Sequence, residues 1–118
     1  MTNLERAKDV YGKVAQGQLM EAFETYYAEN VVMTEPRGTR EGKDACRKAE
    51  EEFLASVETF HGMDVTAFAA DEEKGKVLIE VQMDVTFKGG QRVQMEQVAV
   101  QTWENGQIVH ERFYYNAA

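Results

Sequence analysis

Apolar residues recur at two different spacings along this chain, a helical one in the first half and a strand-like one in the second. Spacings of three and four residues predict helices over about 4–14, 19–27 and 45–57, because such positions share one face of a helix. A short strand is predicted at 30–35, directly before the only proline. Strict alternation then predicts four long strands, at 63–70, 76–88, 92–104 and 107–116.

The turns between these strands carry strong signals. Asn105-Gly106, between two alternating segments, is typical of a two-residue hairpin, and Gly89-Gly90 predicts a second short hairpin. Helices followed by such strands predict an α+β fold: three N-terminal helices packed on a curved, mostly antiparallel sheet that forms a cone with an internal pocket. The length of 118 residues fits a single domain, 1–118.

Alternation also assigns the two faces of the sheet. The second long strand has its apolar, helix-facing side at Val77, Ile79, Val81, Met83, Val85 and Phe87. If the Gly89-Gly90 turn closes a short hairpin, this inner face continues through Gln94, Glu96, Val98, Val100 and Thr102, then through Val109, Glu111, Phe113 and Tyr115. The outer face then carries Met95, Ala99, Trp103, His110, Arg112 and Tyr114.

Two carboxylates, Glu96 and Glu111, fall in mid-strand on this predicted inner face. Burying an unpaired carboxylate is costly, so each needs a partner, a raised pKa or a wet cavity. Glu35, at the end of the short strand, is a third candidate for the same space. One hypothesis makes the mid-strand pair structural, bound to arginines or tyrosines. The other makes it a general base or a water-activating group in an apolar pocket.

The catalytic hypothesis assigns roles to further residues. Glu35 would be the general base, and Glu96 and Glu111 would bind or activate water or donate as neutral acids. The bound molecule would be small and apolar, and the residues in contact with it would be Tyr11, Met83, Phe87, Val98, Val100, Phe113 and Tyr115. Whether turnover occurs, and on which substrate, is left open by these patterns.

The outer face suggests a second role. Met95, Ala99, Trp103 and Tyr114 form a candidate apolar patch there, and a monomer seldom leaves such a patch bare. The simplest explanation is a homodimer in which two sheets pair face to face. The alternative function is therefore a non-catalytic dimerisation or protein-binding module of the same fold.

Composition narrows the classes of partner. The formal charge of −8 argues against nucleic acid and against an anionic membrane surface. No apolar run is long enough for a membrane span, and the first residues lack a signal-peptide pattern, so a cytoplasmic location is expected. We expect no metal site and no cofactor, and a buried Cys46. A solvated face is predicted on the third helix at Lys43, Arg47, Lys48, Glu50, Glu51 and Glu52.

Several short segments, in order, carry a family resemblance: 10–11 to 17–19, 27–32, 35–38, 42–45 and 103–109. Together they resemble the SnoaL-like branch of the nuclear-transport-factor-two-like (cystatin-like α+β cone) superfamily, which also contains ketosteroid isomerases, limonene epoxide hydrolases and polyketide cyclases. The resemblance implies the cone fold predicted above from alternation.

The resemblance also implies roles for single residues. In ketosteroid isomerases an acidic residue at the position of Glu35 abstracts the substrate proton. The places of their oxyanion-hole tyrosine and aspartate fall on Val10, one residue before Tyr11, and on Val100. Epoxide hydrolases of this fold use two carboxylates and an arginine around a water, and polyketide cyclases use acid–base aldol chemistry in an apolar pocket.

Overall fold

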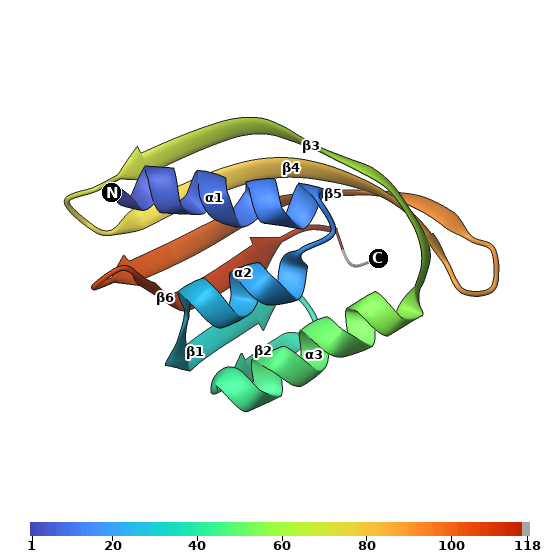
Figure 1. Ribbon diagram of the computed structural model, residues 1–118, viewed down its shortest axis with the longest axis horizontal. Helices are drawn as coiled ribbons and strands as arrows, with labels where there is room; N and C mark the ends of the chain where they lie inside the picture. The colour runs from blue at the N-terminus through green and yellow to red at the C-terminus, as the bar shows by residue number, and fades with distance from the viewer. Residues whose placement is uncertain (117–118) are drawn as a thin grey trace.

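The computed structural model describes residues 1–116; residues 117 and 118 of the predicted domain lie outside this part (Figure 1). The elements in chain order are α1 (Asn3–Ala15), α2 (Leu19–Tyr26), β1 (Tyr27–Glu35), β2 (Gly38–Glu41), α3 (Lys43–Ser56), β3 (Val57–Asp71), β4 (Lys76–Phe87), β5 (Arg92–Glu104) and β6 (Gln107–Tyr114). The fold class is α+β, as predicted. None of the helices in residues 1–116 is long and apolar enough to cross a membrane.

One sheet joins all six strands, in the order β2-β1-β6-β5-β4-β3. Neighbouring strands are antiparallel except β1 and β6, which run parallel. The long strands β3, β4 and β5 bend over α1, while α2 and α3 lie nearer β1 and β2 (Figure 1). The sheet therefore has a concave face toward the helices and a convex face away from them.

The start of α1 is held from two directions. Thr2 and Glu5 form a reciprocal capping box at its N-terminus. The carboxylate of Glu72, in the β3–β4 turn, also accepts hydrogen bonds from the backbone amides of Asn3 at 3.0 Å and Leu4 at 2.9 Å. A negative charge at a helix N-terminus is favourable because it meets the positive end of the helix dipole. These contacts fix α1 against the end of the sheet.

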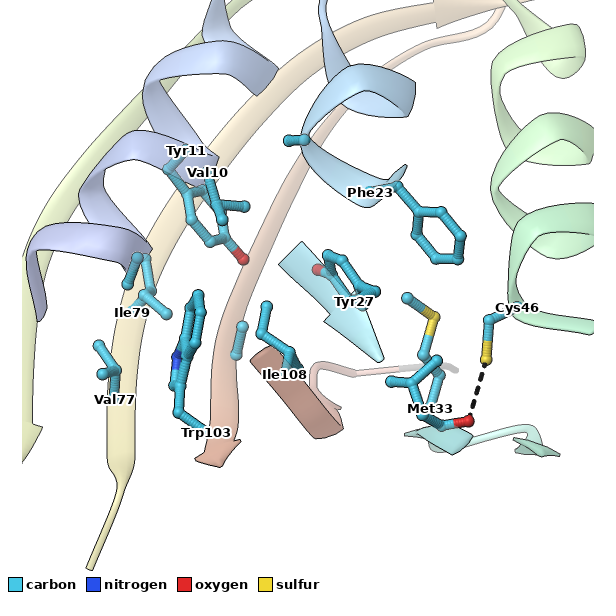
Figure 2. Packing of buried hydrophobic residues seen from close by; sticks show 14 of the residues in the cluster. Val10, Tyr11, Phe23, Tyr27, Met33, Cys46, Val77, Ile79, Trp103 and Ile108 are labelled. Atoms are coloured by element: carbon cyan, nitrogen blue, oxygen red, sulfur yellow. Dashed lines mark hydrogen bonds between the residues drawn. The ribbon is translucent and has the colours of Figure 1, made fainter. Parts of the chain in front are cut away.

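The apolar core lies between the helices and the concave face (Figure 2). Phe23 of α2 stacks on Tyr27 of β1 with ring centroids 4.8 Å apart, and Trp103 of β5 meets Tyr26 edge-on at 5.7 Å. Other fully buried members are Ala7, Ala22, Val31, Cys46, Val77, Ile79, Ala99 and Ile108. The predicted inner face of β4 is confirmed at Val77, Ile79, Val81 and Val85, all of which are buried.

The predicted faces of β5 are wrong by one residue. The structure pairs Thr86 with Arg92 and Met83 with Met95, so odd positions of β4 lie beside odd positions of β5. The cause is an extra residue in the turn: the Phe87 amide bonds to the Gln91 carbonyl at 2.8 Å, and both Gly89 and Gly90 have positive φ. Because side chains alternate along a strand, one added residue exchanges the two faces.

A second irregularity restores the prediction in β6. The Asn105-Gly106 turn is confirmed, with both residues at positive φ, and Trp103 pairs with Ile108. The next pair is Thr102 with His110, so Val109 is an extra residue that forms a β-bulge. Gln101 therefore lies beside Glu111, and Glu111 and Phe113 point to the concave face as predicted.

Smaller differences concern the segment around α3. Strand β2 was not predicted, and β3 begins at Val57, directly after α3, instead of near residue 63. The third helix is less solvated than predicted, because Lys43 is buried with its ammonium group near the Glu24 carbonyl. Glu50 is also partly buried. Fewer of the charged residues of α3 are therefore exposed to solvent than the sequence predicted.

The register can be tested by comparing Trp103→Ala with Glu96→Ala in urea unfolding. We expect Trp103→Ala to lower the free energy of unfolding by about 3–5 kcal/mol, because it empties a core site that is only 3% exposed. Glu96→Ala, on the exposed side of the same strand, should change it by less than about 0.5 kcal/mol. A larger loss for Glu96→Ala would contradict the observed pairing of β4 with β5.

Candidate functional site

A chain of hydrogen bonds crosses the concave face and ends on a buried carboxyl group. Trp103 Nε1 donates to Gln101 Oε1 at 3.0 Å, and Gln101 Nε2 donates to Glu111 Oε2 at 2.9 Å. The Tyr27 hydroxyl donates to the other Glu111 oxygen, Oε1. Glu111 is 1% exposed and Gln101 is not exposed at all. Both oxygens of the carboxyl group are thus engaged by side chains from β1 and β5.

Glu111 has no ion-pair partner among the described residues. Burial raises the pKa of Glu111, and the hydrogen bonds from Tyr27 and Gln101 oppose this effect. The pKa of the Tyr27 hydroxyl is raised well above its ordinary value by burial and by the Glu111 charge, so Tyr27 remains a proton donor at neutral pH. The pair is a neutral donor bound to a carboxyl group that resists ionisation.

Tyr11 of α1 faces the same region (Figure 2). Its ring is buried, with 7% of the residue exposed, and burial together with the charges of Glu111 and Glu50 raises its pKa well above the ordinary value. Every fully enclosed side-chain nitrogen or oxygen in residues 1–116 has a hydrogen-bond partner, but the Tyr11 hydroxyl has none in that part of the chain. The Tyr11 hydroxyl is thus a donor in a buried environment without a partner among these residues.

Glu50 of α3 is the second carboxyl group near this region. Its pKa is raised to about 7 by burial and by the Glu111 charge, and Arg40 of β2 acts in the opposite direction. Two carboxyl groups that interact through a poorly solvated space do not both ionise readily. The side chain of Glu50 has neither a hydrogen bond nor an ion pair among the described residues.

Glu35 and Tyr115 meet at the end of β1, where the Tyr115 hydroxyl donates to Glu35 Oε2. Both side chains are partly buried. Burial and the Glu35 hydrogen bond raise the pKa of Tyr115, whereas the positive charges of Arg37 and Arg40 lower it. The positive charge of Arg40 thus acts both on Tyr115 and on Glu50.

The structure brings some of the predicted site residues together and separates others. The inner-face residues Met83, Phe87 and Phe113 are partly buried, and Phe87 meets Phe53 of α3 edge-on at 6.3 Å. Glu96, Val98 and Val100 instead lie on the convex face, because the added turn residue reverses β5. Glu96 is exposed there, which removes it from the group that contains Glu35 and Glu111.

The predicted outer patch changes for the same reason. Met95, Ala99 and Trp103 lie on the concave face, where Ala99 is fully buried and Trp103 belongs to the core. Tyr114 is on the convex face as predicted, half exposed, with the Arg112 guanidinium 4.8 Å from its ring centroid. Leu78, 41% exposed, shares this face with Val98 and Val100.

Three residues of the site were missed by sequence reasoning. Tyr27 was not named as a site residue, and the predicted alternation of β5 places Gln101 on the outer face. Glu50 was assigned to the solvated face of α3, although it stands four residues after buried Cys46 and three before Phe53. That spacing places it on the sheet side of the helix and could have identified it.

Within residues 1–116, no group of three or more acidic, histidine or cysteine side chains is placed to hold a metal ion.

The sequence model of the SnoaL-like domain matches residues 1–115. The chain belongs to the SnoaL-like family. Among proteins of curated function, no match was found. The buried carboxyl and tyrosine pair described above therefore lies in a SnoaL-like domain.

A Mesorhizobium loti protein proposed to be a SnoaL-like polyketide cyclase is 32% identical to the chain, with a TM-score of 0.84 and coverage of 98% of this chain and 100% of that one. A Bacillus subtilis protein proposed to be an isomerase has a TM-score of 0.84 at 19% identity, covering 98% and 90%. A Catenulispora acidiphila protein with a ketosteroid isomerase-like fold, in complex with trimethylamine, has a TM-score of 0.77 at 16% identity, covering 92% and 84%. The last two similarities show the fold alone.

The unusual protonation of Glu50 predicts how stability varies with pH. The Glu50 pKa is 4.5 in the unfolded chain and about 7 in the folded protein, so the folded state holds the proton more tightly. This stabilisation of the fold is complete below pH 4.5 and is lost as pH rises through 7. Relative to wild type, Glu50→Gln should therefore gain stability between pH 4.5 and 8, by up to about 3 kcal/mol. Urea unfolding at a series of pH values measures the difference. The exposed neighbour variant Glu51→Gln should show no such trend, and a flat difference for Glu50→Gln would contradict the assignment.

Proposed function

We propose that this SnoaL-like protein binds a small apolar molecule between its helices and the concave face of its sheet and acts on it by acid–base catalysis. The observation that carries the proposal is the buried Tyr11 side chain, whose hydroxyl has no hydrogen-bond partner in residues 1–116 and whose pKa is raised by burial and by the Glu111 charge. A carbonyl or hydroxyl oxygen of a bound molecule would accept its hydrogen bond. Buried polar groups usually have partners, so an unpartnered one favours a ligand.

The apolar residues near this region support a ligand of the same character. Met83, Met95 and Phe113 lie on the concave face but are only partly buried, in contrast to Val77, Ile79 and Ala99 further along the same strands. Some apolar surface of the concave face is thus only partly covered, although Val81 and Val85, on either side of Met83, are buried. Pockets for small molecules combine such surface with a few polar groups.

Each polar residue has a role in the proposal. Tyr11 orients the molecule by donating to its oxygen. Glu111, held by Tyr27, supplies the buried carboxyl group behind Tyr11. Glu35 accepts a proton from the molecule at the rim, where Tyr115 fixes its carboxylate. Glu96 has no part in it, because it is exposed on the convex face.

The comparisons support a reaction of this general class. The M. loti relative is proposed to be a polyketide cyclase and the B. subtilis protein an isomerase. Cyclisation and isomerisation of carbonyl compounds both move protons to and from carbon next to a carbonyl group. A tyrosine donor and carboxyl groups near apolar surface are suited to this chemistry.

Ligand binding can be tested with a thermal-shift panel of ring ketones, hydroxyquinones and a terpene epoxide. A compound present at 100 times its Kd should add about 2.7 kcal/mol to the stability of the folded protein. Tyr11→Phe should weaken the binding of a responding compound by about 2- to 10-fold, because one hydrogen bond is lost. The matched variant Tyr114→Phe, on the convex face, should bind as wild type does. An unresponsive panel, or equal binding by Tyr11→Phe, would count against the proposal.

We also propose that the protein is a homodimer in which the convex faces pair. Leu78, Val98, Val100 and Tyr114 form the apolar centre of this face. An open depression of about 300 Å³ beside it is lined in part by Glu80, Glu96 and Tyr114. Arg112 stacks on the other side of Tyr114. Opposite charges that flank one apolar patch suit a two-fold axis, which places each arginine near a glutamate of the second copy.

The dimer can be tested by sedimentation of Leu78→Asp. A charge in the centre of the patch should convert the dimer to a monomer at micromolar concentration, because an aspartate would be buried without a partner. Leu54→Asp is the matched control, since Leu54 on α3 is as exposed as Leu78 but lies away from the convex face, and it should remain dimeric. Monomeric wild-type protein, or a dimeric Leu78→Asp variant, would refute the proposed interface.

A further inference from the structure

Glu50 stands on the side of α3 that faces the sheet. It follows Cys46, which is fully buried and whose thiol lies near the carbonyls of Val31 and Arg40, and it precedes Phe53, which contacts Phe87 of β4. Residues three and four apart share one face of a helix, so Glu50 lies between two positions that are anchored to the sheet. Its carboxyl group is therefore directed toward the concave face.

The charged and titratable groups that interact with Glu50 come from four other elements and from its own helix. Glu111 of β6 and Arg40 of β2 act on its charge, and Glu50 acts in turn on Tyr11 of α1, Tyr27 of β1 and Cys46 of its own helix. Arg40 is the single cation in this set, and it is exposed. Glu111 is already bound on both oxygens by Tyr27 and Gln101.

The two carboxyl groups therefore differ in what they can reach. Glu111 is enclosed and its hydrogen bonds are satisfied. The Glu50 oxygens are unpaired within residues 1–116, and the residue is only partly buried. Of the pair, only Glu50 is free to contact a bound molecule. Tyr11 of α1 also lacks a hydrogen-bond partner in residues 1–116, although it is buried.

We propose that Glu50 is a further catalytic residue of the site, which transfers a proton directly to and from the bound molecule, and that Glu111 is a positioning residue that acts on the molecule through Glu50. This inference rests on the proposed function. It adds a second proton-transferring carboxyl group to Glu35 and implies a substrate with a carbonyl oxygen next to an acidic C–H bond.

The proton transfer is balanced without any further reactant. Neutral Glu50 gives its proton to the carbonyl oxygen of the molecule and becomes a carboxylate, while Glu35 takes a proton from the adjacent carbon. The C–H electron pair becomes the carbon–carbon double bond of an enol, and no electrons are gained or lost. Return of a proton to carbon and of the enol proton to Glu50 restores both groups. Glu111 favours the neutral form of Glu50 before the step through like-charge repulsion.

The test uses dicyclohexylcarbodiimide, an apolar reagent that reacts with neutral carboxyl groups, on the whole wild-type protein without substrate. The acid proton moves to a reagent nitrogen, the carboxyl oxygen bonds to the central carbon, and rearrangement leaves a stable N-acylurea that contains the whole reagent. We expect peptide mass spectrometry to find the label on Glu50 at pH 7. The rate should fall about tenfold per pH unit above a midpoint near 7.

Variants separate the roles of the neighbours. Glu111→Gln should move the midpoint of labelling to lower pH, because a repelling charge is removed. Arg40→Gln, a change at an exposed residue that cannot prevent folding through the core, should move it to higher pH. Glu51→Gln should leave it unchanged. Absence of label on Glu50 at pH 7, or a midpoint that neither Glu111→Gln nor Arg40→Gln changes, would overturn the inference.

The labelling result is independent of the ligand panel. Label on Glu50 with no responding compound would leave a reachable neutral carboxyl group but reject the proposed binding function, and with it the catalytic role of Glu50. A responding compound without label on Glu50 would reject this inference alone. If both succeed, a responding compound should slow the labelling of Glu50, and labelling at an unchanged rate would exclude direct contact between Glu50 and that compound.

Discussion

The structure depends most on how it accommodates the carboxyl group of Glu111 in the middle of an apolar concave face. No cation neutralises it among the described residues, so its two oxygens must be satisfied by uncharged donors. Tyr27 reaches it from β1 and Gln101 from β5, and Trp103 orients Gln101 in turn. The hydrogen bond from Gln101 requires that Gln101 pairs with Glu111 across β5 and β6, and the bulge at Val109 produces this pairing. One hydrogen-bonded group thus ties three strands together and fixes their register.

Side chains without a hydrogen-bond partner lie beside this bonded group. Trp103, Ile79 and Ile108 are buried in the core cluster, and such a region contributes stability. Tyr11, a member of the same cluster, and Glu50 of α3 interact with Glu111 but lack hydrogen-bond partners in residues 1–116, and apolar side chains such as Met83 are only partly covered. The proposed site would draw on this fixed support, because catalytic groups need rigid neighbours.

Sequence reasoning predicted the elements and the fold well, and the candidate site only in part. Helical spacing and alternation are local properties, and Asn105-Gly106 is a local turn signal, so each could be read directly. The faces of β5 depended on whether the Gly89-Gly90 turn holds two residues or three, and two adjacent glycines permit both. Glu111 was assigned correctly although two intervening steps were wrong, since the extra turn residue and the bulge at Val109 cancel. Bulges depend on tertiary hydrogen bonds such as that between Gln101 and Glu111, which no local pattern records.

Glu50 illustrates a different limit. Its helical spacing from Cys46 was visible, but α3 contains seven charged residues, and the usual preference of charge for solvent favoured the wrong side. What distinguishes Glu50 is that charges from other elements act on it: Glu111 comes from the last strand and Arg40 from the short strand β2. Electrostatic coupling of this kind arises only when the chain is folded, because the low polarity of the interior strengthens it. The raised pKa of Glu50 is therefore a property of the folded protein, and no sequence motif around Glu50 indicates it.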